Sequence, residues 1–191
     1  AINKAMAEAF DVLQTRYQSG GSVTGLPTGY TEFDEMTAGL QPTDLVILAA
    51  RPAMGKTTLA LNIADNVAQT DQGKVLVHSL EMNDAEMVTL ALARAAGVDS
   101  QEFFEETGWS SETWGRLMLA AEERTKPDGG NLLLNDSHYG LGAICRITEK
   151  AHRKHGLGLV VVDYLQLVQV DLGKNANREQ AVAAVSRALK L

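Results

Sequence analysis

Residues 45–58 read Leu45-Val46-Ile47-Leu48-Ala49-Ala50-Arg51-Pro52-Ala53-Met54-Gly55-Lys56-Thr57-Thr58. The apolar run 45–50 predicts a strand that is buried on both faces. The run from Thr57 to Gln69 repeats apolar residues at helical spacing and predicts a helix. The tight turn between them predicts a phosphate-binding loop, because turn amides, a helix N-terminus and Lys56 together supply hydrogen-bond donors and positive charge.

Three residues of this loop suit the binding of a triphosphate. Gly55 lets the backbone approach the phosphates, Lys56 offsets their charge, and the Thr57 hydroxyl suits a magnesium ion. The usual pattern, G-x-x-x-x-G-K-[ST], begins with glycine, whereas Ala50 holds that position here. Gly-Lys-Thr triplets also occur in ordinary turns, but a strand before and a helix after favour nucleotide binding. The residues expected to bind ATP are Ala50, Arg51, Pro52, Ala53, Met54, Gly55, Lys56, Thr57 and Thr58.

Two further apolar runs end in single acids. Residues 74–81 predict a buried strand that delivers Glu81 at its carboxyl end, where open α/β sheets bind ligands. Glu81 is therefore a candidate general base for an attacking water, although a solvated residue at the end of a strand would look the same. Residues 158–163 predict a third strand ending in Asp163, which suits an acid on the magnesium side. Hydrophobic strands often end in aspartate, so Asp163 gains its meaning from Lys56 and Thr57.

Composition sets the broad class of the protein. The chain has 191 residues, is 45% hydrophobic and 5% aromatic, and so suits one helix-rich α/β domain. Its net charge of −7 neither supports nor excludes a DNA partner. Cys145 is the single cysteine, which excludes an intramolecular disulfide and suits a reducing compartment. Without a membrane-length apolar run or a signal-peptide pattern, we expect a soluble, cytoplasmic protein with no membrane partner.

Residues 2–18 predict an amphipathic helix that ends at Ser19-Gly20-Gly21. Its apolar stripe must be buried either on the chain's own core or on another subunit, and the residues alone leave both open. The stripe consists of Ile2, Met6, Phe10, Leu13 and Tyr17.

The remaining elements are interpreted as packing elements. A short helix at 30–36 is expected to turn Phe33 and Met36 inward. Trp109 and Trp114 are interpreted as core residues, and His78 as a core histidine with its hydrogen bonds satisfied. Further helices are predicted at 84–96, from Ser110 or Ser111 onward, at 144–155 and at 179–191, with a short strand at 131–134.

Three motifs, taken together, resemble the ATPase domain of DnaB-type replicative DNA helicases, bacterial or phage. They are the loop 50–58, Ser79-Leu80-Glu81-Met82 and Val162-Asp163-Tyr164-Leu165-Gln166-Leu167. The likeness runs from about Ser22 to the end and is loose only over 98–158. It implies a RecA-like P-loop NTPase domain of fold class α/β, with a mostly parallel sheet flanked by helices. The implied domains are a linker helix and hinge at 1–21 and an ATPase domain at 22–191, C-terminally incomplete because the family's domain continues with another strand and an arginine finger.

The resemblance also implies a function and its residues. Lys56 and Glu81 would be catalytic, Thr57 and Asp163 would hold Mg²⁺, and the loop 169–178 would touch DNA through Lys174 and Arg178. With ATP and Mg²⁺ as cofactors, the protein would move 5′ to 3′ along single-stranded DNA and unwind duplexes. It would form a homo-hexamer through the linker helix and the ATPase interfaces. In the full-length protein, primase and a helicase loader are the expected further partners.

Two other functions remain open. One is a different RecA-like ATPase, such as a recombinase or a clock-type hexamer, against which the Asp-Tyr-Leu-Gln-Leu sequence argues. The other is a nucleotide-binding assembly or loading module, with which the acidic net charge is compatible. ATP turnover stimulated by single-stranded DNA would separate the three functions.

Overall fold

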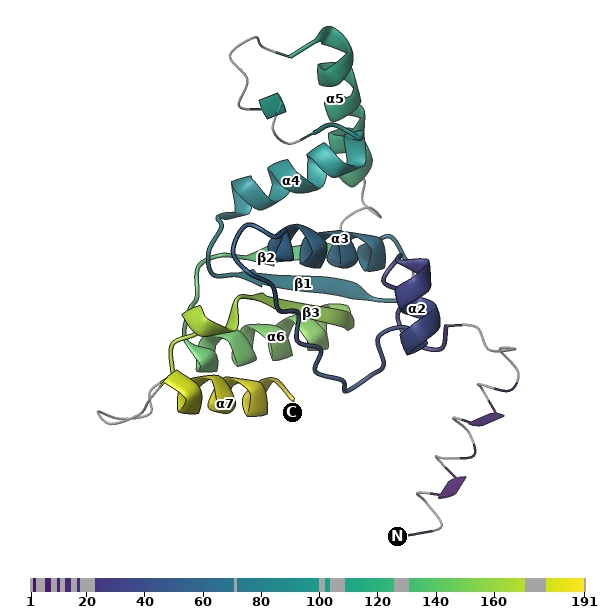
Figure 1. Ribbon diagram of the computed structural model, residues 1–191, viewed down its shortest axis with the longest axis vertical. Coiled ribbons are helices and arrows are strands. Elements are labelled where there is room, and N and C mark those ends of the chain that lie inside the picture. The colour runs from purple at the N-terminus through teal and green to yellow at the C-terminus, as the bar shows by residue number, and fades with distance from the viewer. Residues whose placement is uncertain are drawn as a thin grey trace. The chain divides into compact units, whose positions relative to one another are not determined.

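The computed structural model divides the chain into two units, Ala1–Asp44 and Leu45–Leu191 (Figure 1). It describes residues 23–70, 72–99, 102–103, 109–125, 131–170 and 178–190. In the N-terminal segment it describes Ile2, Met6, Ala7, Phe10, Leu13, Gln14 and Tyr17. The predicted domain boundary at residue 21 stays a prediction.

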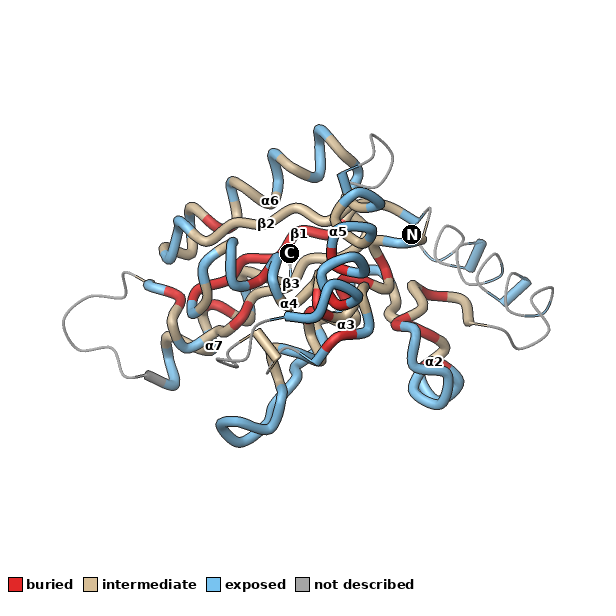
Figure 2. The backbone as a smooth tube through the Cα atoms, turned by 90° about the horizontal axis from the view of Figure 1, so that it is seen from above, coloured by how far each residue is buried: buried red, intermediate tan, exposed pale blue. Residues whose placement is uncertain are grey.

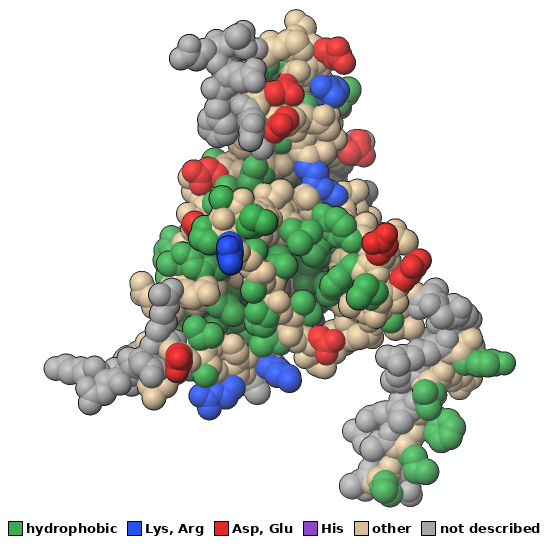
Figure 3. Space-filling model, in the orientation of Figure 1, with side chains coloured by type: hydrophobic (Ala, Val, Ile, Leu, Met, Phe, Trp, Pro, Cys, Tyr) green, Lys and Arg blue, Asp and Glu red, His purple; other side chains and the backbone are tan. Residues whose placement is uncertain are grey.

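In the first unit, the described positions of the N-terminal segment are helical. All five members of its apolar stripe are exposed, from 57% for Met6 to 87% for Tyr17, and side chains of this kind project along the segment in Figure 3. The helical conformation agrees with the predicted amphipathic pattern. What covers the stripe stays open.

Helix α2, Thr31–Thr37, turns a carboxylate inward rather than apolar side chains. Phe33 is 40% exposed and Met36 is 85% exposed, so the expectation that both point inward is wrong. The inward residue is Asp34, 5% exposed, whose Oδ1 accepts hydrogen bonds from the Thr28 amide (2.9 Å) and the Thr28 hydroxyl (2.7 Å). The buried carboxylate therefore organises the turn before the helix.

The second unit is built on a parallel sheet in the order β2-β1-β3. Its strands are β1 (Lys74–Ser79), β2 (Leu132–Asn135) and β3 (Leu157–Asp163), which confirms the predicted α/β class and parallel sheet. Helix α3 (Lys56–Ala68) covers one face, and α6 (Leu141–His155) covers the other (Figure 1). Central strand β1 is buried almost throughout, as the red segments in Figure 2 show.

Further elements of the unit lie around the sheet. They are α4 (Asp84–Ala96), α5 (Ser111–Thr125), α7 (Arg178–Leu189) and the 3₁₀ turn Leu165–Leu167. A capping box begins α4, in which Asn83 and Glu86 satisfy each other's backbone amides. Beside the sheet, Leu80, Ile144, Val168 and Val185 form a buried cluster that joins the strand ends to α6 and α7.

The pairing of β1 with β3 is irregular at only one end. Lys74 pairs with Leu157 but Val75 pairs with Leu159, so Gly158 is an extra residue in β3. From Val75 to Ser79 the pairing is one to one, and it ends with Ser79 opposite Asp163. At the irregular end the strands approach so closely that a Cβ on Gly73 would lie 2.9 Å from the Gly156 carbonyl oxygen.

The predicted strand at 45–50 is absent, although the structure describes all of these residues. Val46 and Ile47 are each 57% exposed, and Figure 3 shows hydrophobic side chains on this face of the unit. A strand needs a neighbour for its backbone hydrogen bonds, and the recorded ladders join only β1, β2 and β3 within the described part. The prediction of a strand buried on both faces is therefore wrong for this structure.

The interpretation of both tryptophans as core residues is also wrong. Trp109 and Trp114 are 43% and 53% exposed, with ring centroids 5.5 Å apart and an interplanar angle of 25°. Phe103 packs on Trp109 at 5.1 Å. The indoles thus pack on each other at the surface, while Leu117 is the apolar residue that α5 buries.

A buried charge holds α3, α4 and α5 together. Asp65 on α3 is 2% exposed and receives two hydrogen bonds from Arg124 on α5, at 2.6 and 2.8 Å. Arg94 on α4 bonds to the same carboxylate and to Asn66. Because a desolvated carboxylate needs such partners, these arginines fix two helices to the one that follows the loop at 50–55.

Candidate functional site

The loop before α3 reverses the chain through left-handed backbone conformations. Ala53 has φ 62° and Gly55 has φ 77°, a region that glycine enters without strain. Gly55 is the N-cap of α3, so the first turn of the helix, beginning at Lys56, presents its amides beside the loop. A Cβ built on Gly55 would meet no atom within 4 Å, so the backbone there is open to a close approach.

The start of α3 meets the end of β3 through one carboxylate. Lys56 Nζ lies 2.7 Å from Asp163 Oδ1, and the Thr57 hydroxyl donates to Asp163 Oδ2 at 2.6 Å. Asp163 is 7% exposed. Thr57 and Asp163 are 106 positions apart in sequence. The fold thus brings the Lys56 ammonium, the Thr57 hydroxyl and the Asp163 carboxylate together.

Tyr164 adds an aromatic face to this cluster, and the sequence had suggested no role for it. The Lys56 ammonium lies 4.2 Å from the centroid of the Tyr164 ring, within the range of a cation–π interaction. In the sequence, the feature that could have pointed to Tyr164 is its position directly after Asp163, the acid that ends β3.

Glu81 follows the neighbouring strand, β1, and is exposed. The amide of Leu80 donates to the carbonyl oxygen of Asp163 at 2.7 Å, so the chains leaving β1 and β3 are still joined beyond the last strand residue of β1. The predicted acids therefore emerge from adjacent parallel strands at the same edge of the sheet, although the structure gives no direct contact between their side chains.

His78, on β1, is a buried histidine with hydrogen-bonding partners on both ring nitrogens, as predicted. It is 0% exposed, with Asn135 Nδ2 3.0 Å from its Nδ1 and Thr148 Oγ1 2.9 Å from its Nε2. An amide N–H can only donate, so Nδ1 accepts and Nε2 carries the proton. Burial first, and then the charge of His138, lower the pKa of His78 to about 4. The ring is neutral at neutral pH.

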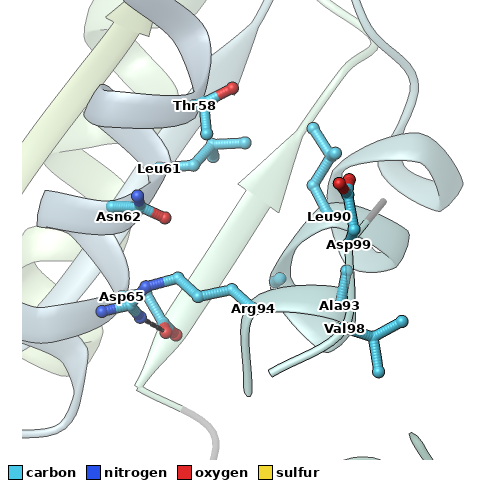
Figure 4. Close-up of a pocket in the computed structure, with 10 residues that line it drawn as sticks. Thr58, Leu61, Asn62, Asp65, Leu90, Ala93, Arg94, Val98 and Asp99 are labelled. Carbon is cyan, nitrogen blue, oxygen red and sulfur yellow. Dashed lines mark hydrogen bonds and ion pairs between the residues drawn. The ribbon is translucent and has the colours of Figure 1, made fainter. Parts of the chain in front are cut away.

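A hollow of about 210 Å³ lies between α3 and α4, and Figure 4 shows Arg94 reaching across it to Asp65. Of the predicted loop residues only Thr58 lines it. Because Lys56, Glu81 and Asp163 are not part of its lining, we do not assign it to the phosphate site.

The two residues predicted to contact DNA are Lys174 and Arg178. Lys174 lies outside the described residues, and Arg178 is the first residue of α7.

Within the described ranges no group of three or more His, Cys, Asp and Glu residues could hold a metal ion by itself. No helix in the described part of the chain is long and apolar enough to cross a membrane.

The chain is similar to curated replicative helicases along nearly its whole length. It is 36% identical to replicative DNA helicase DnaB of Geobacillus stearothermophilus, over 99% of this chain and 41% of that protein. It is also 36% identical to replicative DNA helicase DnaC of Bacillus subtilis, over the same shares. The chain therefore spans about two fifths of the length of these relatives.

Solved structures give the same result for the fold. One of them, an ATPase domain, matches with a TM-score of 0.86 and 32% identity, covering 100% of this chain and 66% of that one. A DnaB-like replicative helicase, solved for its interactions with primase, matches at a TM-score of 0.83 and 32% identity, covering 100% and 44%. The model of the DnaB-like helicase C-terminal domain matches residues 25–191. The chain thus belongs to the DnaB-like helicase C-terminal domain family, with the RecA-like fold of its structural neighbours.

Proposed function

We propose that this chain is the motor part of an ATP-dependent replicative DNA helicase. The observation that carries the proposal is the meeting of Lys56, Thr57 and Asp163 at the start of α3. Membership of the family supports coupling to DNA unwinding, because the named relatives are replicative DNA helicases. A recombinase, a clock-type ATPase or a loading module has no comparable observation in its favour.

The residues present fit magnesium-ATP. Mg²⁺ prefers oxygen ligands, and the Thr57 hydroxyl and the Asp163 carboxylate meet at 2.6 Å. Phosphate oxygens and water would complete its shell, and the ion would offset charge on the transferred phosphoryl group. Loop residues 50–58 would surround the phosphates, with the α3 N-terminus and Lys56 as their main donors. Lys56 would exchange its contact with Asp163 for one with phosphate.

In the proposed reaction Glu81 acts as the general base. It accepts a proton from water while the water oxygen attacks the γ-phosphorus, and the bond to the bridging oxygen breaks with its electron pair passing to ADP. The edge position of Glu81, one strand away from Asp163, supports this role. Lys56 contributes by stabilising negative charge on the phosphoryl oxygens.

The larger assembly is part of the same proposal. We infer that the gene product moves 5′ to 3′ on single-stranded DNA as a homo-hexamer, with the stripe of residues 2–17 packing on a neighbouring subunit. Its exposure of 57–87% supports a need for such a cover. Lys174 and Arg178 are the proposed contacts with DNA phosphates. Primase and a loader are the proposed partners, and one solved relative is described with primase.

The proposal is tested on the complete gene product with two substitutions. Lys56→Ala should weaken ATP binding and lower single-turnover hydrolysis at least about 100-fold, because the phosphates lose the Lys56 ammonium. Lys150→Ala, an exposed lysine on α6, is the matched control and should leave both unchanged. If Lys56→Ala hydrolysed ATP at the rate of the unmodified protein, the assignment of the site would fail.

Glu81→Gln should separate binding from hydrolysis. The amide occupies the same space but does not accept the proton, so the affinity for ATP should persist while the rate falls about 10²- to 10⁴-fold. Glu122→Gln on α5 is the matched control. If Glu81→Gln lost ATP binding and turnover equally, Glu81 would be a structural residue. If single-stranded DNA left the ATP turnover of the unmodified protein unchanged, the helicase part of the proposal would fail.

A further inference from the structure

The chain between β1 and α4 makes a turn that is closed by one buried hydroxyl. Ser79, the last residue of β1, is 3% exposed. Its Oγ donates to the carbonyl oxygen of Met82 at 2.6 Å and accepts from the amide of Met82 at 3.1 Å. The hydroxyl thus holds both backbone groups of Met82, and the ring that it closes contains Leu80 and Glu81.

Both flanks of this turn are fixed by other contacts. On one side Leu80 is 3% exposed, and its amide bonds to the Asp163 carbonyl at 2.7 Å. On the other side Asn83 and Glu86 form the capping box of α4. Glu81 is the exposed residue between these anchors. With the backbone held before and after it, the direction in which the Glu81 side chain leaves the sheet depends on the bond from Ser79 to Met82.

We propose that Ser79 is a positioning residue for Glu81, which keeps the general base in line with the attacking water. The inference rests on the proposed function and adds to it a residue outside the set proposed to bind phosphate and magnesium. Both recorded hydrogen bonds of the Ser79 hydroxyl go to the backbone of Met82, within its own turn. It therefore acts on the rate of the chemical step and not on substrate affinity.

The size of the effect follows from geometry. Removing the hydroxyl frees Met82 and lets the turn relax, and a displacement of about 1 Å at a catalytic group costs on the order of 100-fold in rate. Partial relaxation costs less, because Leu80 and Asn83 still hold the flanks. We expect kcat to fall about 10- to 100-fold with KM for ATP unchanged.

The test compares three substitutions in the complete gene product. Ser79→Ala removes the hydroxyl, and Ser79→Cys fills nearly the same space but offers only a weak sulfur donor, so both should lose rate. Ser79→Thr keeps the hydroxyl and suits a strand, so it should restore most of the rate. Thr70→Ala is the matched control. The Thr70 hydroxyl also bonds a carbonyl and an amide, and it lies just after the C-terminal end of α3, away from the loop at 50–55.

A double substitution separates positioning from structural support. If Ser79 acts through Glu81, Ser79→Ala should slow the unmodified protein but not the residual single-turnover rate of Glu81→Gln. A loss of equal size in both backgrounds, or a rise in KM together with the fall in kcat, would overturn the proposal. So would a normal rate in Ser79→Ala. The proposed function fails separately, when Glu81→Gln itself keeps the full rate.

Discussion

The buried histidine of β1 should make the protein less stable in mild acid. His78 is 0% exposed, and its pKa is lowered from 6.5 to about 4, first by burial and then by the nearby His138. In the unfolded chain the same ring titrates near 6.5. Between these two pH values the unfolded chain binds more protons than the folded one, so stability falls as the pH falls.

The magnitude follows from the two pKa values. At pH 7 the ring is neutral in the folded protein and mostly neutral in the unfolded chain, so the folded protein keeps nearly all of this stability. At pH 5 the unfolded ring is almost fully protonated and the folded ring is not, which costs about 2 kcal/mol of the free energy of unfolding. Below pH 4 the loss approaches about 3 kcal/mol, at 1.36 kcal/mol for each pKa unit.

The assay is urea denaturation followed by circular dichroism at several pH values from 7 to 5. His78→Phe fills the site with a side chain that does not titrate, so its stability should lose about 2 kcal/mol less over this range than that of the unmodified protein. His152→Gln, an exposed histidine on α6, is the matched control and should keep the steeper dependence. Equal slopes for His78→Phe and the unmodified protein would refute the reasoning.

Three further changes have expected outcomes. Asp65→Ala should lower the free energy of unfolding by about 3 kcal/mol in urea denaturation, because it leaves two partly exposed arginines without their carboxylate; a change below about 1 kcal/mol would show that the ion cluster is not stabilising. Tyr164→Leu should raise KM for ATP about 2- to 5-fold by releasing Lys56, whereas Tyr164→Phe, which keeps the ring, should not. Deleting residues 1–18 should lower the oligomer mass in light scattering while circular dichroism keeps its helical signal, and an unchanged mass would instead mean that the apolar stripe packs on its own subunit.

The sequence predicted those elements whose pattern is local. The apolar runs at 74–81 and 158–163 predicted β1 and β3, and the helical spacing of apolar residues over 84–96 predicted α4. The loop chemistry placed Lys56 and Thr57 at the start of a helix, as the structure has them. In each case the residues that determine the element are neighbours in the chain.

What the sequence did not predict depends on contacts between distant residues. An apolar run such as 45–50 becomes a strand only when another segment pairs with it, and its composition does not tell whether one does. The two arginines that pair with Asp65 lie 29 and 59 residues away, so no local pattern predicts them. The exposed tryptophans show the same limit, since helical spacing marks an apolar face but does not identify what covers it.

The pairing of β1 with β3 divides β3 into a part that tolerates a change in length and a part that does not. An insertion beside Gly158 would enlarge a bulge that already exists and leave the pairs from Leu159 onward unchanged. An insertion between Val160 and Val162 would turn Asp163 to the opposite face of the sheet, because side chains alternate along a strand. Between the bulge and Asp163 the length of the strand can therefore change only by an even number of residues if Asp163 is to keep its face. An insertion at the start of the strand would require only a local rearrangement.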